Sequence, residues 1–186
     1  MSATTDILTV KCQAAKIASR ELARMSPDVK NQALSNIADA VMDRESEILD
    51  ANVNDIRSGN QNGMSKAMLD RLLLNHSRLK SMSDDVRSVV ALPDPIGEDF
   101  DQRTLDNGLQ LGRRRVPLGV IGAIYESRPN ITVDISVLCI KSGNSVILRG
   151  GSEAIHSNTI LAEMIRDSIA EAGLTPEAVQ FIDSVD

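Results

Sequence analysis

Residues 119–152 read GVIGAIYESRPNITVDISVLCIKSGNSVILRGGS, and they decide the fold that the sequence predicts. The short apolar run Gly119–Tyr125 is typical of a buried parallel strand, and Ser145–Leu148 predicts a second one. Between them, Ile131–Ile140 has the pattern of a helix, which ends at Gly143. Parallel strands joined by a right-handed crossover helix form the sheets that bind dinucleotides.

The same alternation continues downstream. Ser152 predicts the start of a second helix, which ends at Gly173. A short helical turn at residues 175–177 then precedes a third strand, Val179–Ile182. Residues 118–186 are therefore expected to be the first half of a dinucleotide-binding unit, an incomplete Rossmann-like parallel βαβαβ sheet of the α/β class.

Upstream of this unit, residues 96–117 predict a β-hairpin. Asn107-Gly108 lies between the extended segments Arg103–Leu105 and Leu109–Leu111. An Asn-Gly pair between strands is a strong signal for a two-residue type I′ turn.

Residues 1–95 have a helical pattern and are expected to form the N-terminal helical part of the cofactor domain. Ser26 followed by Pro27 is a helix start signal, because serine caps the free amides and proline suits the first helical position. Ser77 is expected to cap a later helix, and Pro93 ends the helical region.

The composition narrows the function classes. The chain has 186 residues, of which 42% are hydrophobic and only 2% aromatic, so the core must be aliphatic. A net charge of −6 and the near absence of aromatic rings argue against bulk nucleic-acid binding. Residues 1–10 lack the pattern of a targeting peptide, and Cys12 and Cys139 form no disulfide framework. A cytoplasmic location fits best.

The segment Tyr125–Asn130 lies where the first strand ends and a helix begins. Ligands of open α/β sheets bind at this end of the strands, and Arg128 adds a fixed charge. The alternative is an ordinary turn in which Asn130 caps the helix. The residues alone favour neither.

The segment Leu148–Glu153 offers a second candidate, a glycine pair between a strand and a helix. Such a loop can hold a phosphate against the amides of the helix. The segment matches neither the Walker A pattern nor GxGxxG, and an ordinary turn is the better interpretation of this signal alone.

Neither cysteine has the surroundings of a nucleophile. Cys139 belongs to an apolar helical run and is expected to be a buried packing residue, and no histidine is arranged beside Cys12. His156 could approach a phosphate, although a structural role is favoured, and His76 is expected to be exposed. The sequence shows no metal-ligand cluster.

Three blocks of the sequence resemble a known family. The blocks Val116–Asn130, Lys141–Asn144 and Leu148–Asn158 (LRGGSEAIHSN) are similar to gamma-glutamyl phosphate reductases, also called glutamate-5-semialdehyde dehydrogenases, of the aldehyde dehydrogenase superfamily. The resemblance covers essentially the whole chain, as the N-terminal portion of the family. Family members continue well beyond this point, and the remainder carries the catalytic domain with its cysteine.

The resemblance implies a function and a set of site residues. The family reduces L-glutamyl 5-phosphate to L-glutamate 5-semialdehyde and phosphate with NADPH, in L-proline biosynthesis. It implies that Asn130 donates to the oxyanion and that Arg128 holds the phosphate or a carboxylate of the substrate. The implied cofactor-binding residues are Arg149, which suits the 2′-phosphate, Gly150, Gly151, Ser152 and Glu153.

The resemblance also implies partners. The hairpin is expected to join subunits of a homo-oligomer, with residues 113–115, all arginine, pairing with acids of the neighbouring subunit. Glutamate 5-kinase is expected to hand over the substrate. Because the fragment lacks the nucleophile, we expect it to be inactive and to expose an apolar strand edge.

Three alternatives remain. The chain can be the reductase half of a bifunctional pyrroline-5-carboxylate synthase, which ranks second because no kinase segment precedes Met1. A generic aldehyde dehydrogenase ranks third. The third alternative, from a different class, is a non-catalytic module that associates with another chain.

Overall fold

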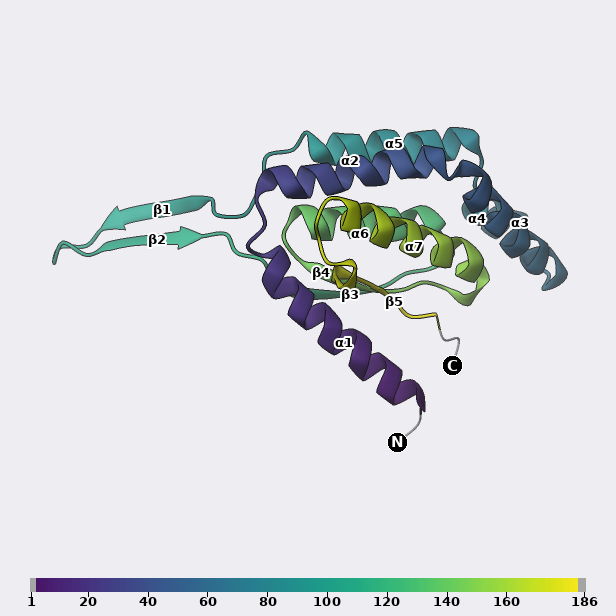
Figure 1. Cartoon of the computed structure of the whole chain (residues 1–186), viewed down its shortest axis with the longest axis horizontal. Coiled ribbons are helices and arrows are strands. Elements are labelled where there is room, and N and C mark those ends of the chain that lie inside the picture. Colours follow the sequence, from purple (N-terminus) through teal and green to yellow (C-terminus); the bar gives the residue numbers. More distant parts are fainter. Residues whose placement is uncertain (1–2, 184–186) are drawn as a thin grey trace.

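A computed structural model describes residues 3–183, and its elements fall into a helical part, a hairpin and a sheet unit (Figure 1). The helical part contains α1 (Ala3–Leu22), α2 (Pro27–Asp43), α3 (Glu45–Gln61), α4 (Lys66–Leu72) and α5 (His76–Val90). The hairpin contains β1 (Asp99–Thr104) and β2 (Gln110–Arg114). The sheet unit contains β3 (Val120–Ile124), α6 (Pro129–Lys141), β4 (Ser145–Arg149), α7 (Ile155–Glu171) and β5 (Val179–Phe181), with 3₁₀ turns at Ser152–Ala154 and Pro176–Ala178.

The sheet is parallel, with strand order β3-β4-β5, which confirms the predicted α/β class. Helices α6 and α7 cover one face of it, α2 and α5 form a further layer on those helices, and α1 lies against the opposite side (Figure 1). The pairing of β3 with β4 runs from Val120 opposite Ser145 to Ile124 opposite Arg149. The ends of both strands, and the loops that follow them, are therefore side by side.

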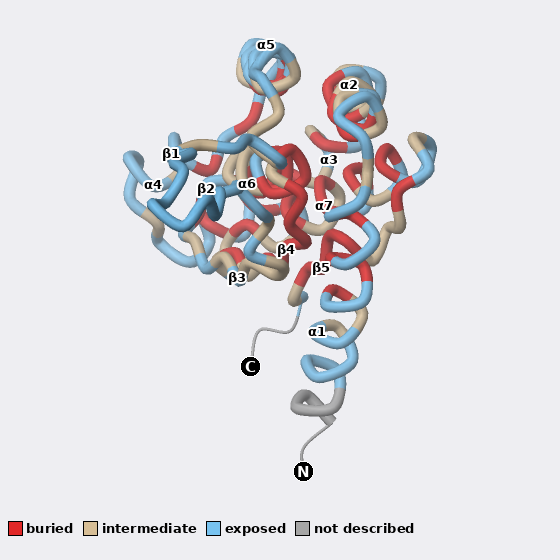
Figure 2. The backbone as a smooth tube through the Cα atoms, turned by 90° about the vertical axis from the view of Figure 1, so that its left-hand side faces the viewer, coloured by how far each residue is buried: buried red, intermediate tan, exposed pale blue. Residues whose placement is uncertain are grey.

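The core is aliphatic, as the composition predicts. Leu34 and Ile37 of α2, Leu79 of α5, Leu148 of β4 and Ile165 of α7 are fully buried and belong to one cluster. Each such side chain contributes about 1.5–3 kcal/mol to folding. Buried residues gather on α6, α7 and the sheet and on the inner side of α2 (Figure 2). The early helices thus share their core with the sheet unit.

Strand β3 differs from its prediction as a buried strand. Its residues are intermediate or exposed, and Ile124 at its end is 89% exposed. The reason is its position, because β3 is an edge strand of the sheet within the described residues. The expected apolar edge is therefore present.

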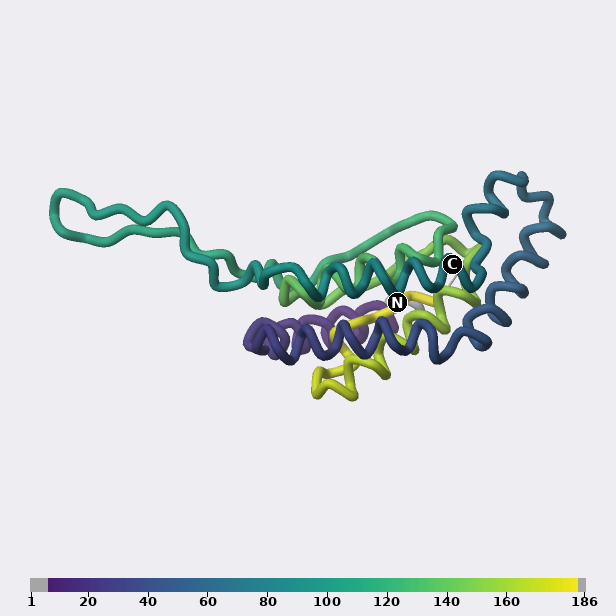
Figure 3. The backbone as a smooth tube through the Cα atoms, turned by 90° about the horizontal axis from the view of Figure 1, so that it is seen from above, coloured from purple at the N-terminus to yellow at the C-terminus, as the bar shows by residue number. Residues whose placement is uncertain are grey.

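The hairpin projects from the body, and α3 and α4 lie at the opposite end of the molecule (Figure 3). The turn of the hairpin is not the predicted type I′. Gly108 has a φ of 82°, but Asn107 is not among the described residues with positive φ. The amide of Gly108 donates to the Leu105 carbonyl at 2.8 Å, and the Leu105 amide donates to the Leu109 carbonyl at 2.8 Å. This is a three-residue loop, a type I turn closed by a left-handed glycine.

The side chain of Asn107 explains this choice of turn. Its Oδ1 accepts a hydrogen bond from the Leu109 amide at 3.1 Å. This local bond favours a backbone with negative φ at Asn107, so only the glycine needs the left-handed region.

The three consecutive arginines at 113–115 are all paired inside the hairpin. The pairs are Arg113–Asp101 at 3.3 Å, Arg114–Asp99 at 2.6 Å and Arg115–Glu98 at 2.6 Å. The Arg115 guanidinium also lies 5.2 Å from the centre of the Phe100 ring. Pairing with acids of another subunit would therefore compete with these intramolecular pairs.

Helix α5 begins earlier than predicted. Asn75, not Ser77, is its N-cap, and the Asn75 side chain accepts from the Arg78 amide at 2.9 Å. Both residue types can cap, but Asn75 has the extended backbone that an N-cap requires. Ser26 caps α2 as predicted, with Pro27 at the first helical position. No helix among residues 3–183 has the length and apolar character needed to cross a membrane.

Candidate functional site

The structure brings together the two loops that the sequence singled out. The loop after β3 and the loop after β4 are joined by Ser127, whose Oγ donates to Glu153 Oε1 at 2.5 Å. The Tyr125 amide also donates to the Arg149 carbonyl at 3.1 Å, which continues the pairing of the strands. The hydroxyl–carboxylate bond therefore fixes one βα loop against the other.

Gly150 is required by close approach and not by an unusual backbone angle, whereas the contact at Gly151 is with the end of the flexible Glu153 side chain. A Cβ on Gly150 would lie 2.2 Å from Asn158 Nδ2, and a Cβ on Gly151 would lie 2.5 Å from Glu153 Oε1. Asn158 is 0% exposed, and its Oδ1 accepts from Thr132 Oγ1 at 2.9 Å. Its Nδ2 has no hydrogen-bond partner within the described chain. A buried donor without a partner thus lies directly behind the loop.

The N-terminus of α7 is closed by a carboxylate from α3. Asp55 accepts from the His156 amide at 3.1 Å, the Ser157 amide at 2.8 Å and the Ser157 hydroxyl at 2.6 Å. These amides are consequently not open to a phosphate, and only the preceding loop remains as a cradle. His156 Nδ1 lies 2.7 Å from Asp55 Oδ1, which supports the structural interpretation of this histidine.

Asn130 is not a helix cap, so that alternative is wrong. Helix α6 begins at Pro129 with Arg128 as N-cap, and Asn130 is one position inside the helix. Its Nδ2 donates instead to Asp134 Oδ2 at 3.0 Å, one turn further along. Burial raises the pKa of Asp134, the bond from Asn130 opposes this shift, and the charge of Asp85 adds to it.

Arg128 and Asn130 line the same cavity, which has a volume of about 300 Å³. The remaining walls come from α4, α5 and the first turns of α6, and their charged and polar residues are Asp70, Arg71, Arg78, Ser81, Asp85 and Asp134. Sequence analysis missed the contribution of α5. The signal was present, since Arg78, Ser81, Met82 and Asp85 recur at helical spacing on one face.

Arg149 belongs to a different cavity. This second cavity, of about 400 Å³, is mainly apolar and lies between α1 and the sheet, where Ile124, Ile147 and Ile182 line it. The Arg149 guanidinium donates to the Gly150 carbonyl and is partly buried. Arg149 therefore lines a different cavity from Arg128 and Asn130, and the Ser127–Glu153 bond joins the two loops that carry these residues.

The expectation that Cys139 is a buried packing residue is confirmed. Cys139 is buried, and burial raises the pKa of its thiol to about 11. Cys12 is exposed on α1 and lines the apolar cavity, away from the cavity of Asn130. Residues 3–183 contain no group of three or more potential metal ligands of the His, Cys, Asp and Glu types.

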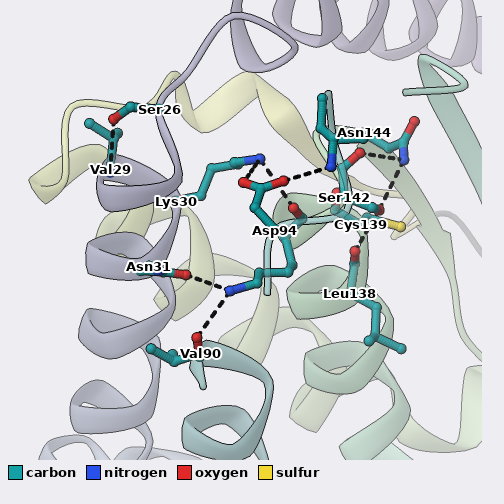
Figure 4. A network of polar contacts seen from close by, with 12 residues as sticks. Ser26, Val29, Lys30, Asn31, Val90, Asp94, Leu138, Cys139, Ser142 and Asn144 are labelled. Atoms are coloured by element: carbon teal, nitrogen blue, oxygen red, sulfur yellow. Dashed lines mark hydrogen bonds and ion pairs between the residues drawn. The ribbon is translucent and has the colours of Figure 1, made fainter. Parts of the chain in front are cut away.

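A buried polar network holds the segment between α5 and the hairpin (Figure 4). Lys30 Nζ lies 2.5 Å from Asp94 Oδ2, and the Lys30 side chain is 3% exposed. Lys141 Nζ donates to Asn31 Oδ1 at 2.7 Å and to the Val90 carbonyl at 3.0 Å. Because buried charges of this kind are costly unless paired, the network fixes α2, α5 and α6 relative to one another.

Known proteins with similar sequences were found for most of the chain. No family model matches the chain. Gamma-glutamyl phosphate reductase of Dehalococcoides mccartyi strain CBDB1 is 55% identical over 176 residues, which are 95% of this chain and 42% of that protein. Its counterpart in Vibrio cholerae is 52% identical over 179 residues, 96% of this chain and 43% of the relative. The chain thus spans less than half the length of these relatives.

Solved structures agree. The crystal structure of gamma-glutamyl phosphate reductase from Thermotoga maritima matches with a TM-score of 0.93 and 38% identity, over 96% of this chain and 43% of that one. The Saccharomyces cerevisiae structure matches with a TM-score of 0.90 and 31% identity, over 100% and 47%. A probable aldehyde dehydrogenase from Listeria monocytogenes, at 17% identity and a TM-score of 0.72, shares the fold over 97% of this chain and 37% of its own. This stretch of sequence therefore belongs to the gamma-glutamyl phosphate reductase family, of whose members it spans about two-fifths.

Proposed function

We propose that this chain is part of a cytoplasmic enzyme that reduces L-glutamyl 5-phosphate to L-glutamate 5-semialdehyde and phosphate with NADPH, in L-proline biosynthesis. The observation that carries the proposal is the cavity at the N-terminus of α6, where the Asn130 amide and the Arg128 guanidinium lie together. These are an uncharged donor and a fixed cation, the two groups that an acyl phosphate requires.

Asn130 acts on the acyl oxygen. Attack of a thiolate on the acyl carbon places negative charge on that oxygen, and a preorganised amide donor stabilises it. One proton of Nδ2 is used by Asp134, which leaves the second for the oxyanion and restricts the rotation of the amide. The thiolate comes from the part of the relatives that this chain does not match, since neither Cys12 nor Cys139 has a suitable environment.

Arg128 binds the leaving phosphate. It is exposed, and the structure gives its side chain no ion pair with a described residue. A guanidinium binds phosphate through two parallel charge-assisted hydrogen bonds, which also orient the acyl phosphate before attack.

The loop after β4 fits an anionic nucleotide. Arg149 supplies a cation for the 2′-phosphate, and Ser152 in the same loop is exposed. NADPH supplies hydride when bound there. Glu153 is engaged by Ser127, so in this proposal it holds the two loops together and its charge is turned away from the 2′-phosphate.

The role of Asn130 is tested in a full-length protein that carries this sequence. The reverse reaction, phosphate-dependent oxidation of glutamate 5-semialdehyde, is followed by NADPH absorbance. Asn130→Ala should lower kcat by roughly 100- to 1000-fold, as loss of one oxyanion donor does. Its melting temperature should change little, because Asn130 caps nothing. Asn54→Ala, at an exposed position of α3, is the matched control. Near-normal turnover of Asn130→Ala would refute the assignment.

The cofactor residues are tested by kinetics with both nucleotides. Arg149→Ala should raise KM for NADP more than KM for NAD, because only NADP has the 2′-phosphate. Arg24→Ala, an exposed arginine without an ion pair in the described chain, is the control. Equal losses with both nucleotides would contradict the role of Arg149. The isolated chain should bind NADPH saturably without turnover; an absence of saturable binding would favour a non-catalytic association module.

A further inference from the structure

Two carboxylates in the cavity at the N-terminus of α6 form no ion pair with a described residue. Asp85 lies on α5 and Asp134 on α6, and the two helices pack directly against each other. Asp134 accepts from Asn130 through Oδ2 only, and Oδ1 accepts nothing from the described residues. Asp85 has no hydrogen bond or ion pair in that part of the chain either. The cavity therefore offers acceptor oxygens from both of its helical walls.

The cations of the same cavity divide into two kinds. Arg78 is used internally, because it donates to the Asp70 carboxylate at 2.9 Å and to the Leu73 carbonyl at 2.7 Å. Arg71 and Arg128 are exposed and have no ion pair with a described residue. The cavity thus presents free groups of both signs, which favours a ligand that carries an ammonium and more than one anionic group.

We propose that Asp85 and Asp134 bind the α-ammonium of an amino-acid substrate and that Arg71 binds its α-carboxylate. The proposal rests on the proposed function, because Arg128 and Asn130 assign the phosphate and the acyl oxygen to the same cavity. An ammonium has three donors, so two carboxylates from facing helices can share it.

The electrostatics of the cavity agree with this assignment. Burial is the main cause that raises the pKa of Asp134, and the nearby charge of Asp85 adds to the shift. Two negative charges without a counterion repel each other, and a bound ammonium would offset that repulsion. Asp85 is exposed and Asp134 is only partly buried, so a ligand in the cavity can reach both carboxylates.

The test compares two substrates in the full-length protein that carries this sequence. Glutamate 5-semialdehyde has the α-ammonium, and 5-oxopentanoate is the same aldehyde acid without it. Asp85→Asn should raise KM for the semialdehyde about 10- to 100-fold, the loss expected for one charge-assisted hydrogen bond, and should leave KM for 5-oxopentanoate unchanged. Cyclisation of the semialdehyde is the same for every variant and cancels in the ratio.

Asp84→Asn is the matched control, because Asp84 is the adjacent carboxylate but pairs with Lys80 on the outer side of α5. Asp134→Asn should show the same substrate dependence, together with a lower kcat if the Asn130 amide loses its orientation. Equal changes for both substrates in Asp85→Asn, or no change for either, would overturn the ammonium site. A wild-type protein that oxidises neither aldehyde would instead refute the proposed function.

Discussion

Asp55 is predicted to hold the N-terminus of α7 in place, although it lies far from that helix in sequence. It is 1% exposed on α3 and accepts both backbone and side-chain hydrogen bonds from the first turn of α7. The perturbation is Asp55→Ala, with Asp55→Asn as the conservative variant. Asp50→Ala is the control, since Asp50 is exposed on the same helix.

The expected loss of stability in Asp55→Ala follows from the groups that lose their hydrogen-bond partner. Ser157 is 0% exposed, so its amide, now 2.8 Å from Asp55 Oδ2, is left unsatisfied in the variant. A buried donor without a partner costs about 1–3 kcal/mol, and loss of an N-cap costs about 1 kcal/mol. We expect Asp55→Ala to lower the free energy of unfolding by about 2–4 kcal/mol. Asp55→Asn retains one acceptor oxygen and should lose less.

Urea denaturation of the chain is monitored by far-UV circular dichroism. The free energies of unfolding are compared between variants whose m-values are equal. Hydrogen exchange at the amides of residues 156 and 157 should accelerate in Asp55→Ala, because the carboxylate protects them. The control should stay within about 0.5 kcal/mol of the wild type. If Asp55→Ala also stays within that margin, the carboxylate does not cap α7 and the argument is wrong.

Three further predictions concern reactivity, pH and assembly. With a pKa of about 11, Cys139 should resist iodoacetamide at pH 8 while exposed Cys12 reacts, and equal labelling of the native chain would contradict its burial. Because folding raises the pKa of Asp134, protonation favours the folded state; this contribution is complete below the unfolded pKa and is lost as pH rises through the folded pKa. Asp134→Asn should therefore be more stable than the wild type at pH 7 and similar to it at pH 3, and urea midpoints that show no gain at pH 7 would exclude this. Deletion of residues 104–111 should reduce the oligomer mass of a full-length protein measured by light scattering; an unchanged mass would count against the hairpin as an association element.

Local sequence determined the elements of this protein. The apolar runs around Val120 and Ser145 and the helical spacing between them predicted the βαβαβ order, and Ser26 with Pro27 predicted the start of α2. These signals succeed because strand and helix preferences act over a few residues. They failed where neighbouring residues compete for one local role, as at Asn75 against Ser77, and in the hairpin turn.

The candidate site was predicted in part. The loops of Asn130 and Arg149 were located correctly at the ends of adjacent strands, since parallel strands bring their carboxyl ends to one edge of the sheet. Whether those residues act as proposed stays a prediction. The separation into two cavities could not be predicted, because it depends on which helix covers each side of the sheet.

Only the tertiary structure decided which distant residues meet. Asp55 and Ser157 are 102 positions apart in the chain, and Ser127 and Glu153 are 26 apart. Asp85 lines the cavity of Arg128 and Asn130 only because α5 packs on α6. Local patterns carry no information on such contacts, since packing of whole elements around the aliphatic core sets which side chains face one another.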